Sequence, residues 1–414
     1  MPLGIYISVP FCRTKCSYCN FASDVFSKVV FERYVDRVCA DIVSAPQIAQ
    51  EVGGQLDHEV DSIYLGGGTP TVLEAGQLQR IFHAVRSQFQ VLPDAEVTVE
   101  CAPGTLTPDV LQGLLRCGVN RVSLGVQSFI DAEAAAVGRL HKRSVVLEDI
   151  AHLREAGIAN INIDLIAGLP HQTAETWQQS LDQTLATGAP HASVYMLEVD
   201  EDSRLGREVI AGGTRYHAHF VPDDEATADF YLTACEQLNA AGITQYEISN
   251  FARAGSESRH NLKYWTRQPY LGFGVDAHSM LKLATPKFST LKSATLKSAT
   301  PDADAIRFAA ADVLEKYVAG SPVQSTIVSR VAALEESFFL GLRLNRGVNL
   351  REIAATFGQP ALDNLSPAIS ELVSGGLLQR AGESISLTSR GRLLSNEVFQ
   401  CFLAAPVKSN ASPN

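Results

Sequence analysis

Short runs rich in β-branched residues alternate with amphipathic stretches along the first 200 residues. The apolar runs indicate strands, and the stretches with apolar positions three or four residues apart indicate helices. We expect strands at residues 5–9, 62–65, 96–100, 121–126, 161–166 and 193–197, with helices at 31–43, 75–89, 108–116, 145–156 and 174–187. This alternation is typical of parallel βαβ units. It predicts an α/β domain whose sheet is either open or a partial (β/α)6 TIM-like barrel, with its active site at the carboxyl ends of the strands.

The end of the chain has a different pattern. Helices are expected at 331–341, 349–357 and 368–375, followed by a hairpin over 377–379 and 384–387 and a last helix from Arg390. That order outlines an α+β winged-helix-like module. Such modules often bind DNA, but fold alone does not assign function, and a basic stripe is missing. A packing or substrate-covering role is favoured.

Between these two parts lie a helical pattern at 224–241 and an irregular polar stretch at 247–265. Thr-Leu-Lys-Ser-Ala then occurs twice in tandem over residues 290–299, which fits neither a helical nor a strand period. We therefore expect a solvated loop that could be deleted without loss of folding. The predicted domains are a core over 1–240, a covering segment over 241–281, a low-complexity insertion over 282–304, and a winged-helix-like domain with a disordered tail over 305–414.

Composition and charge narrow the class of protein. The chain has 414 residues, of which 46% are hydrophobic and 19% charged, so it is globular and long enough for two domains. No apolar run approaches the roughly 18 residues of a membrane span, and no signal peptide precedes the first strand, so we expect a cytoplasmic protein. The net charge is −11, from 34 basic and 45 acidic residues, which disfavours nucleic acid as the main partner.

Three of the eight cysteines are clustered directly after the first predicted strand, at Cys12, Cys16 and Cys19. A closed structural zinc site would require a fourth protein ligand, and no Cys or His follows nearby. An iron–sulfur cluster held by three thiolates leaves one iron free to bind something other than protein. Zinc and plain redox cysteines remain the alternatives.

Four further segments make this pattern specific. They are Tyr6-Ile-Ser-Val-Pro-Phe-Cys12, Leu65-Gly-Gly-Gly-Thr-Pro-Thr71, Ser123-Leu-Gly-Val-Gln-Ser-Phe129 and Asn162-Ile-Asp-Leu-Ile-Ala-Gly-Leu-Pro170. Together with the cysteines they resemble the radical S-adenosylmethionine (SAM) superfamily, and within it the oxygen-independent coproporphyrinogen III oxidases and their heme-chaperone relatives. The resemblance implies a [4Fe–4S] cluster whose open iron is chelated by SAM.

The resemblance also implies a set of SAM contacts. The matching positions are Tyr6, Tyr18, Gly67, Gly68, Thr69, Glu100, Gln127, Arg139 and Asp164. Glycines at a strand end let backbone approach a ligand, although a plain tight turn is the alternative. A carboxylate at Glu100 could accept hydrogen bonds from ribose or an ammonium group, or simply be solvated. Asp164 lies among apolar neighbours and needs a partner, and Arg139 could supply one for purely structural reasons.

Two positions of this chain depart from the patterns of these relatives, and one further motif indicates the branch. The oxidase pattern has a further cysteine where this chain has Phe21, and the family usually has a histidine where this chain has Ser8. Residues 259–265 resemble the His-Asn-x-x-Tyr-Trp signature of the heme-chaperone branch. His260 could ligate heme iron beside the aromatic faces of Tyr264 and Trp265, or these residues could merely pack. His278 is a second candidate ligand, and it lies in a glycine-rich return over residues 272–279 that we expect near the mouth of the active site.

The sequence thus predicts a heme chaperone that binds a [4Fe–4S] cluster, SAM and heme, and delivers heme to an acceptor protein that it does not identify. An electron donor for the cluster is also implied. The rival interpretation is an enzyme, the oxygen-independent coproporphyrinogen III oxidase, which decarboxylates two propionates to vinyl groups. A DNA-binding regulator is the third.

Overall fold

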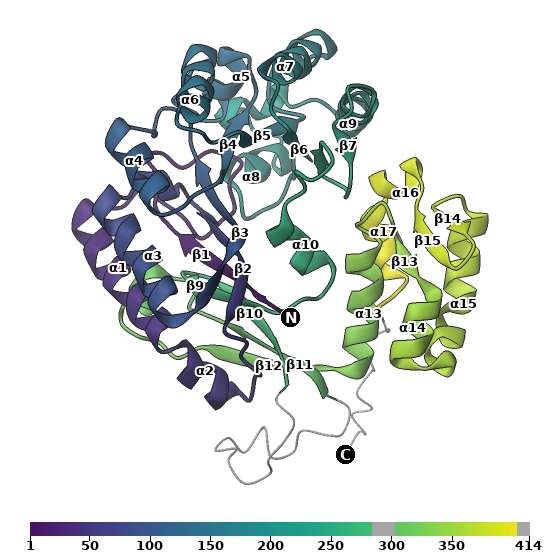
Figure 1. Ribbon diagram of the computed structural model, residues 1–414. Coiled ribbons are helices and arrows are strands. Elements are labelled where there is room, and N and C mark those ends of the chain that lie inside the picture. Colours follow the sequence, from purple (N-terminus) through teal and green to yellow (C-terminus); the bar gives the residue numbers. More distant parts are fainter. Residues whose placement is uncertain (284–302, 404–414) are drawn as a thin grey trace, which may run out of the picture.

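A computed structural model describes residues 1–283 and 303–403. Its main feature is a curved mixed sheet of twelve strands in the order β12-β11-β10-β9-β1-β2-β3-β4-β5-β6-β8-β7 (Figure 1). Strands β12 and β7 form its two edges, so the barrel is partial rather than closed. The α/β fold with a carboxy-terminal winged-helix-like module agrees with the sequence prediction.

Six parallel strands form the centre of this sheet. They are β1 (Leu3–Val9), β2 (Glu59–Gly67), β3 (Gln90–Cys101), β4 (Arg121–Gln127), β5 (Asn160–Ala167) and β6 (His191–Met196). Within this group each strand pairs with the strand that follows it in the sequence, as is usual for βαβ units. All six overlap the predicted strands, and all begin earlier than predicted, except β4, which starts at Arg121 as expected.

Helices cover the outer, convex face of the sheet (Figure 1). They are α1 (Lys28–Val43), α2 (Ala45–Val52), α3 (Ala75–Gln88), α4 (Pro108–Arg116), α5 (Asp131–Ala136), α6 (Arg143–Glu155), α7 (Ala174–Thr187) and α9 (Asp224–Ala240). Local signals set their ends: Thr173 accepts a hydrogen bond from the Thr176 amide in a capping box, and Gly188 ends α7 in a left-handed conformation.

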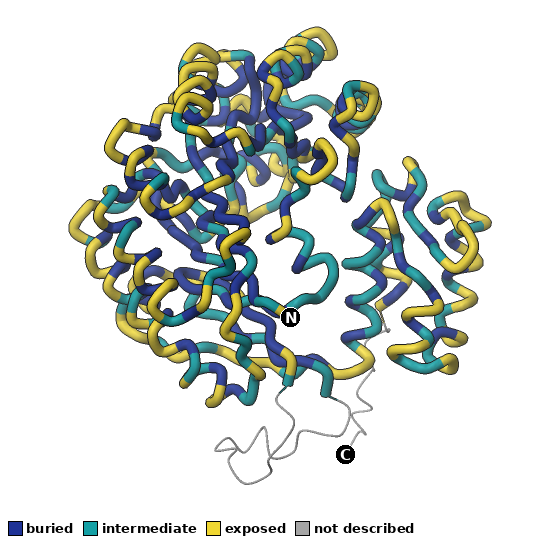
Figure 2. Tube along the Cα trace, in the orientation of Figure 1, coloured by how far each residue is buried: buried dark blue, intermediate teal, exposed yellow. Residues whose placement is uncertain are grey.

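The alternation along β4 shows how the strands divide the inside from the outside. Val122, Leu124 and Val126 are fully buried in the apolar core under the helices. Ser123, which lies between Val122 and Leu124, and Gln127, which follows Val126, face the concave side. Because successive side chains point to opposite faces, each central strand presents apolar residues to the helices and polar ones to the interior. The concave side is therefore a polar cavity rather than a second core. Along the chain trace, buried residues concentrate on the central strands and exposed residues on the covering helices (Figure 2).

Shorter elements extend the sheet and connect the parts. They are η1 (Pro70–Val72), α8 (Arg204–Ile210), η2 (Arg215–Phe220), β7 (Thr244–Gln245), β8 (Asn250–Ala252), α10 (Arg259–Trp265), β9 (Tyr270–Gly274), β10 (His278–Lys282), β11 (Ala303–Ala309), α12 (Leu314–Val318) and β12 (Gln324–Ser329). The predicted insertion over 282–304 lies between the antiparallel strands β10 and β11. Its ends, Lys282 and Ala303–Asp304, belong to those strands, and the repeat at 290–299 lies outside the described residues.

The carboxy-terminal module has its own small core. It comprises α13 (Arg330–Gly341), β13 (Val348–Asn349), α14 (Leu350–Phe357), α15 (Gln359–Ser374), β14 (Leu378–Ala381), β15 (Ser384–Leu387), α16 (Ser389–Leu393) and α17 (Ser395–Gln400). Helix α15 is longer than predicted, because Pro367 does not end it. Arg267 pairs with both Glu336 and Asp304 at 2.9 Å and so links α13 to the sheet.

None of the helices in the described ranges is both long and apolar enough to cross a bilayer.

Candidate functional site

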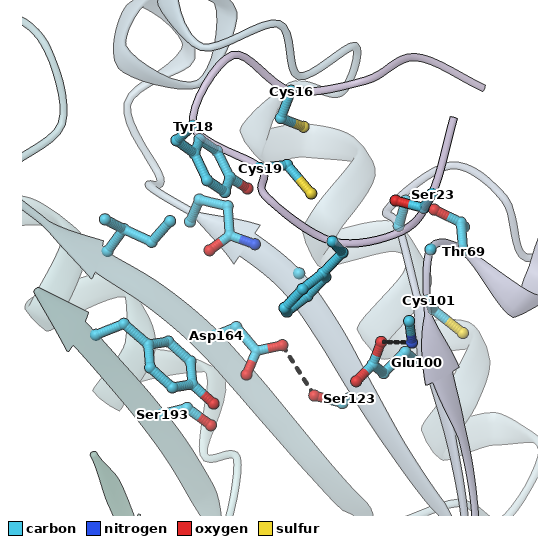
Figure 3. A pocket seen from close by; sticks show the side chains of 18 of the residues that line it. Cys16, Tyr18, Cys19, Ser23, Thr69, Glu100, Cys101, Ser123, Asp164 and Ser193 are labelled. Carbon is cyan, nitrogen blue, oxygen red and sulfur yellow. Dashed lines mark hydrogen bonds between the residues drawn. The ribbon is translucent and has the colours of Figure 1, made fainter. Parts of the chain in front are cut away.

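A cavity of about 360 Å³ opens at the carboxyl ends of the central strands. A volume of this size suits a small-molecule ligand. Eleven of the fifteen residues predicted from the sequence line it: Cys12, Cys16, Tyr18, Cys19, Gly67, Gly68, Thr69, Glu100, Gln127, Arg139 and Asp164. Figure 3 shows the cysteine loop above the two carboxylates. Tyr6, His260, Tyr264 and Trp265 are not among the lining residues, and neither is the second candidate heme ligand, His278, which is exposed.

The cysteine loop follows β1 and is held at both ends by backbone hydrogen bonds. The Cys12 amide donates to the Asp24 carbonyl, and the Asp24 amide donates to the Pro10 carbonyl, each at 3.0 Å. In the middle of the loop, the Ser17 amide donates to Val137, and the Leu205 amide donates to Ser17. These contacts join the two ends of the loop to each other and tie its middle to the end of α5 and to α8.

The three thiols of this loop fit a multi-iron cluster. None of them forms a disulfide, and Cys16 and Cys19 lie close enough to Cys12 for their charges to contribute to raising the pKa of its thiol, for which burial is the main cause. Across the described residues, no three His, Cys, Asp or Glu side chains converge on a point that would suit a single metal ion. A cluster requires a looser arrangement, since each thiolate binds a different iron.

Glycines on the second strand form a backbone cradle beside this loop. A Cβ on Gly68 would lie 2.7 Å from the Phe11 carbonyl oxygen and 2.8 Å from that of Val9. Gly67 has φ +98°, and a Cβ there would lie 3.1 Å from the Ser8 Oγ and 3.5 Å from the Tyr6 hydroxyl. The side chains of Tyr6 and Ser8 therefore lie next to Gly67, on the side to which a Cβ of this residue would point. The position of Gly68 requires glycine because backbone, which cannot move aside cheaply, occupies the space.

Replacing Gly68 with Ala should lower the free energy of unfolding by about 1–3 kcal/mol, because the added methyl group overpacks against the strand that leads to Cys12. The affinity for SAM should fall as well, since the cradle must widen. Gly76→Ala is the matched control: its Cβ would meet no atom within 4 Å. Urea unfolding and equilibrium dialysis with SAM measure both effects. Equal values for the two variants would contradict the importance of the cradle.

Two carboxylates line the inner wall. Glu100 accepts hydrogen bonds from the Tyr64 hydroxyl at 2.8 Å and the Gly67 amide at 3.1 Å. Asp164 accepts from the Ser123 hydroxyl at 2.9 Å and the Asn162 amide at 2.7 Å. Burial raises the pKa of both groups, that of Glu100 to about 7, and the hydrogen bonds oppose the shift. Both groups thus favour a ligand that brings hydroxyl or cationic donors.

The raised pKa of Glu100 predicts a pH-dependent stability. The folded protein retains a proton that the unfolded chain releases above its ordinary pKa of 4.5, so stability should decrease as pH rises from 4.5 to 7. Above pH 7 the cost is about 3–4 kcal/mol, at roughly 1.4 kcal/mol per pKa unit. Glu100→Gln should therefore match the wild type at pH 5 and exceed its free energy of unfolding at pH 8. The exposed Glu155→Gln is the control, and identical pH profiles for all three proteins would refute the assignment.

Arg139 and Gln127 complete the rim. The Arg139 Nε atom is buried and has no hydrogen-bond partner, and no ion pair joins Arg139 to Asp164 in the structure, although their charges interact. Gln127 ends β4 with φ +66°, a conformation that residues other than glycine seldom adopt. An unpartnered guanidinium atom and a strained backbone at one rim are features expected where a ligand binds.

Helix α10 closes the opposite end of the cavity. Ser258 and Asn261 line the cavity, and the Nδ1 atom of His260 lies 3.1 Å from the Ser62 hydroxyl near the start of β2. Helix α10 thus forms the floor of the cavity. The ion pair between the buried Lys263 and the partly exposed Asp61, 2.7 Å apart, holds the helix against the amino end of the sheet.

His260 itself is enclosed, with 1% of its surface exposed. Its Nε2 atom lies 2.9 Å from the Tyr264 hydroxyl, so both ring nitrogens are engaged. Burial and, to a smaller extent, Lys263 lower the pKa of His260 to about 3. The ring of Trp265 faces away, with the Arg343 guanidinium 4.3 Å from its centroid. The arrangement brings Tyr6, Tyr64, His260 and Tyr264 together, but not with the cysteines.

Several lining residues were missed by the sequence analysis. Tyr64, Ser123, Asn162, Ser193 and Tyr195 occupy interior positions of four strands. Ser123, Asn162 and Ser193 form one hydrogen-bonded chain across neighbouring strands. The available signal was the alternation itself, because polar residues at every second position of a strand with otherwise apolar neighbours mark a polar interior.

Comparison with known proteins places these features in context. A family model described as the radical SAM superfamily matches residues 6–184, and one described as the HemN C-terminal domain matches residues 328–394. The heme chaperone HemW of Bacillus subtilis is 34% identical over 401 residues, which are 96% of this chain and 98% of that protein. HemW of Escherichia coli is 30% identical over 97% of this chain and 98% of that protein. The structure of E. coli coproporphyrinogen III oxidase (HemN) has the same fold, with a TM-score of 0.78 and 24% identity over 97% of this chain and 90% of that one.

Proposed function

Because this chain belongs to the HemW-like branch of the radical SAM coproporphyrinogen oxidase family, we propose that it is a heme chaperone. It binds a [4Fe–4S] cluster, SAM and heme, and passes the heme to an acceptor protein. The observation that carries this proposal is the likeness along nearly the whole chain to proteins named heme chaperone HemW. Neither the acceptor nor the electron donor is identified by the chemistry of the site.

Cys12, Cys16 and Cys19 hold the cluster in this proposal. When bound, such a cluster supplies an open coordination position and single electrons. SAM would lie in the cavity beside the loop, against Gly67, Gly68 and Thr69, while Glu100 and Asp164 would accept hydrogen bonds from its hydroxyl or ammonium groups. The free cysteine thiols and the position of these residues on the cavity wall support this fit.

The heme ligand in this proposal is His260, beside Tyr264 and Trp265, as predicted from the sequence. The engaged ring nitrogens of His260 mean that ligation there would require α10 to leave the floor of the cavity. The pH dependence of heme binding that an ordinary histidine would give, with loss below about pH 6.5, does not apply to a buried group whose pKa is about 3.

The second candidate is the oxygen-independent coproporphyrinogen III oxidase, which is favoured by the likeness of the whole fold to HemN. Phe21 distinguishes the two candidates. It lines the cavity with 59% of its surface exposed, at the position where the oxidase pattern has a cysteine.

The deciding experiment gives the cluster-loaded protein coproporphyrinogen III, SAM and a reductant. We expect no protoporphyrinogen, and a separate titration should show one heme bound per chain, followed by the Soret band. Efficient decarboxylation would replace the chaperone proposal with the oxidase. Absence of heme binding would refute the chaperone proposal as well.

A further inference from the structure

Gly138 covers the outer side of the cysteine loop. It follows α5 and Val137, whose carbonyl accepts a hydrogen bond from the Ser17 amide at 3.1 Å. A Cβ built on Gly138 would lie 3.8 Å from the Cys16 Cα atom and 3.8 Å from the Lys15 carbonyl oxygen. Cys16 is 7% exposed, whereas Gly138 is partly exposed. One residue of backbone without a side chain therefore separates the loop from the outer surface at this point.

An exposed leucine lies two residues further along the chain, at Leu140. It is 73% exposed, although a single exposed apolar side chain needs no explanation by itself. Lys142 and Arg143, at the start of α6, are exposed as well. An apolar centre with a charged, solvated rim is the usual anatomy of a protein–protein interface.

Arg13 extends this surface onto the cysteine loop itself. Its Nη1 atom donates to the Gly104 carbonyl at 3.0 Å, and its side chain is exposed. A Cβ on Gly104 would lie 3.3 Å from the Cγ1 atom of Val145, in the first turn of α6. Arg13 and the start of α6 are therefore neighbours. We give the name Leu140 face to five residues: Arg13, Gly138, Leu140, Lys142 and Arg143.

The charge of this face is opposite to the net charge of the chain, which is −11. The two segments that build it, residues 10–23 and 137–147, contain no Asp or Glu. Their Arg and Lys residues are Arg13, Lys15, Arg139, Lys142 and Arg143. The first turn of α6 also has no acidic residue, so the partial positive charge of the helix amino terminus adds to the face. The face therefore attracts an anionic partner that the net charge of the chain repels.

The carboxylates around the face have other partners. Asp131 and the buried Asp149 each accept a hydrogen bond from a backbone amide at 2.7 Å. An acidic run at residues 198–202 belongs to the cavity mouth, where Asp200 accepts from the Asn20 side chain at 3.1 Å. Within the described ranges, none of the three cations of the Leu140 face forms an ion pair. Their charges are therefore available to a partner.

We propose that the Leu140 face is the docking surface for the electron donor of the cluster, and that this donor is a small acidic protein that carries a single electron. The inference rests on the proposed function, because it requires the cluster on Cys12, Cys16 and Cys19. In the docked complex one electron passes from the reduced donor to the oxidised cluster, so the donor is oxidised as the cluster is reduced, with no bond formed or broken. Electron tunnelling slows steeply with distance, and the backbone at Gly138 offers a short path to Cys16.

The composition of the face favours a protein over a nucleic acid. Three exposed cations surround an apolar side chain, whereas a phosphate backbone is bound by a longer row of cations. Interfaces between redox partners are small, and a single exposed face suits one of that kind. Complementary charge gives fast and oriented association rather than tight binding. That property fits a donor that must leave after it has delivered its electron.

Binding of oxidised flavodoxin, an acidic one-electron carrier, to the cluster-loaded full-length protein tests the face without electron transfer. Lys142→Glu combined with Arg143→Glu should weaken binding at least about tenfold at low ionic strength, because two attractions become repulsions. The loss should shrink as salt is added, since exposed charges are screened. Leu140→Asp should weaken binding too, at a position so exposed that folding does not depend on it. Isothermal titration calorimetry measures these affinities.

Reduction of the cluster gives an independent measurement. With reduced flavodoxin at subsaturating concentration, the cluster's visible absorption should fade more slowly in the Lys142→Glu, Arg143→Glu protein, by a factor similar to the loss of affinity. Reduction by dithionite, a small molecule that needs no docking surface, should be unchanged. Iron content should equal that of the wild type, which shows that the cluster is still in place.

Arg351→Glu combined with Arg380→Glu is the matched control, because it makes the same change of charge at two exposed positions of the carboxy-terminal module. It should leave affinity and reduction rate within about twofold of the wild type, since distant exposed charges are screened. An equal loss in this control, or wild-type values in Lys142→Glu, Arg143→Glu, would overturn the docking face while the proposed function stands. A wild type that dithionite reduces, but that flavodoxin neither binds nor reduces, would overturn it as well. If the wild type holds no cluster, the proposed function itself fails.

Discussion

Replacing Cys12, Cys16 or Cys19 singly with Ala should remove nearly all cluster iron and the broad visible absorption of the reconstituted protein. Three thiolates are the whole protein ligand set that the loop offers, and two do not hold a four-iron cluster stably. The loop is anchored by backbone hydrogen bonds at Asp24, Val137 and Leu205, so the apoprotein should remain folded. Iron and sulfide analysis, with circular dichroism for folding, measures the outcome.

Cys101→Ala is the sharpest control for this experiment, because Cys101 lines the same cavity. It is 3% exposed at the end of β3, outside the loop that carries the three clustered cysteines. Iron content should stay at the wild-type level. If Cys101→Ala loses the cluster as well, or if any one of the clustered cysteines can be removed without loss of iron, the ligand assignment is wrong.

The order of the central strands and the position of the cavity were predictable from sequence, for a physical reason. Strands that alternate with helices lie parallel to one another, so their carboxyl ends are at the same edge of the sheet. The polar segments after the first, second and fifth strands must therefore meet at that edge. The loop with Cys12, the cradle with Gly68 and the rim residue Asp164 do meet there. The strand limits were less predictable, because a polar residue such as His191, which lines the cavity, precedes the apolar run of its strand.

The position of α10 could not be predicted because no local pattern determines it. Its place depends on a pair 202 residues apart in sequence, Lys263 with Asp61, and on Glu96, which accepts hydrogen bonds from the amides of Arg259 and His260. Such contacts exist only after the sheet has formed. The contact between His171 and His217 is a similar case, since the two residues are brought together by backbone conformations that the sequence does not signal.

His260→Ala should lower the free energy of unfolding at pH 7 by about 2–4 kcal/mol. The change leaves a cavity where a fully enclosed ring was, and it leaves the buried Ser62 hydroxyl without its partner. His278→Ala is the matched control, because His278 is exposed and its contact with Asp276 is 3.7 Å long. Urea unfolding of both variants should separate them clearly. Wild-type stability in His260→Ala would contradict the structural role of this residue.

The same variant should also change how stability depends on pH, and this distinguishes a buried neutral histidine from an exposed ligand. The pKa of His260 is about 3 in the folded protein against an ordinary 6.5, so the unfolded chain binds a proton first as pH falls below 6.5. Stability conferred by the neutral ring is complete above pH 6.5 and decreases at up to roughly 1.4 kcal/mol per pH unit below it. The difference between wild type and His260→Ala should therefore shrink by about 2 kcal/mol between pH 7 and pH 5. The other buried histidines, His141 and His191, are present in both proteins and cancel. A difference that stays constant over this range would mean that His260 takes up protons freely in the folded state, as an accessible heme ligand would.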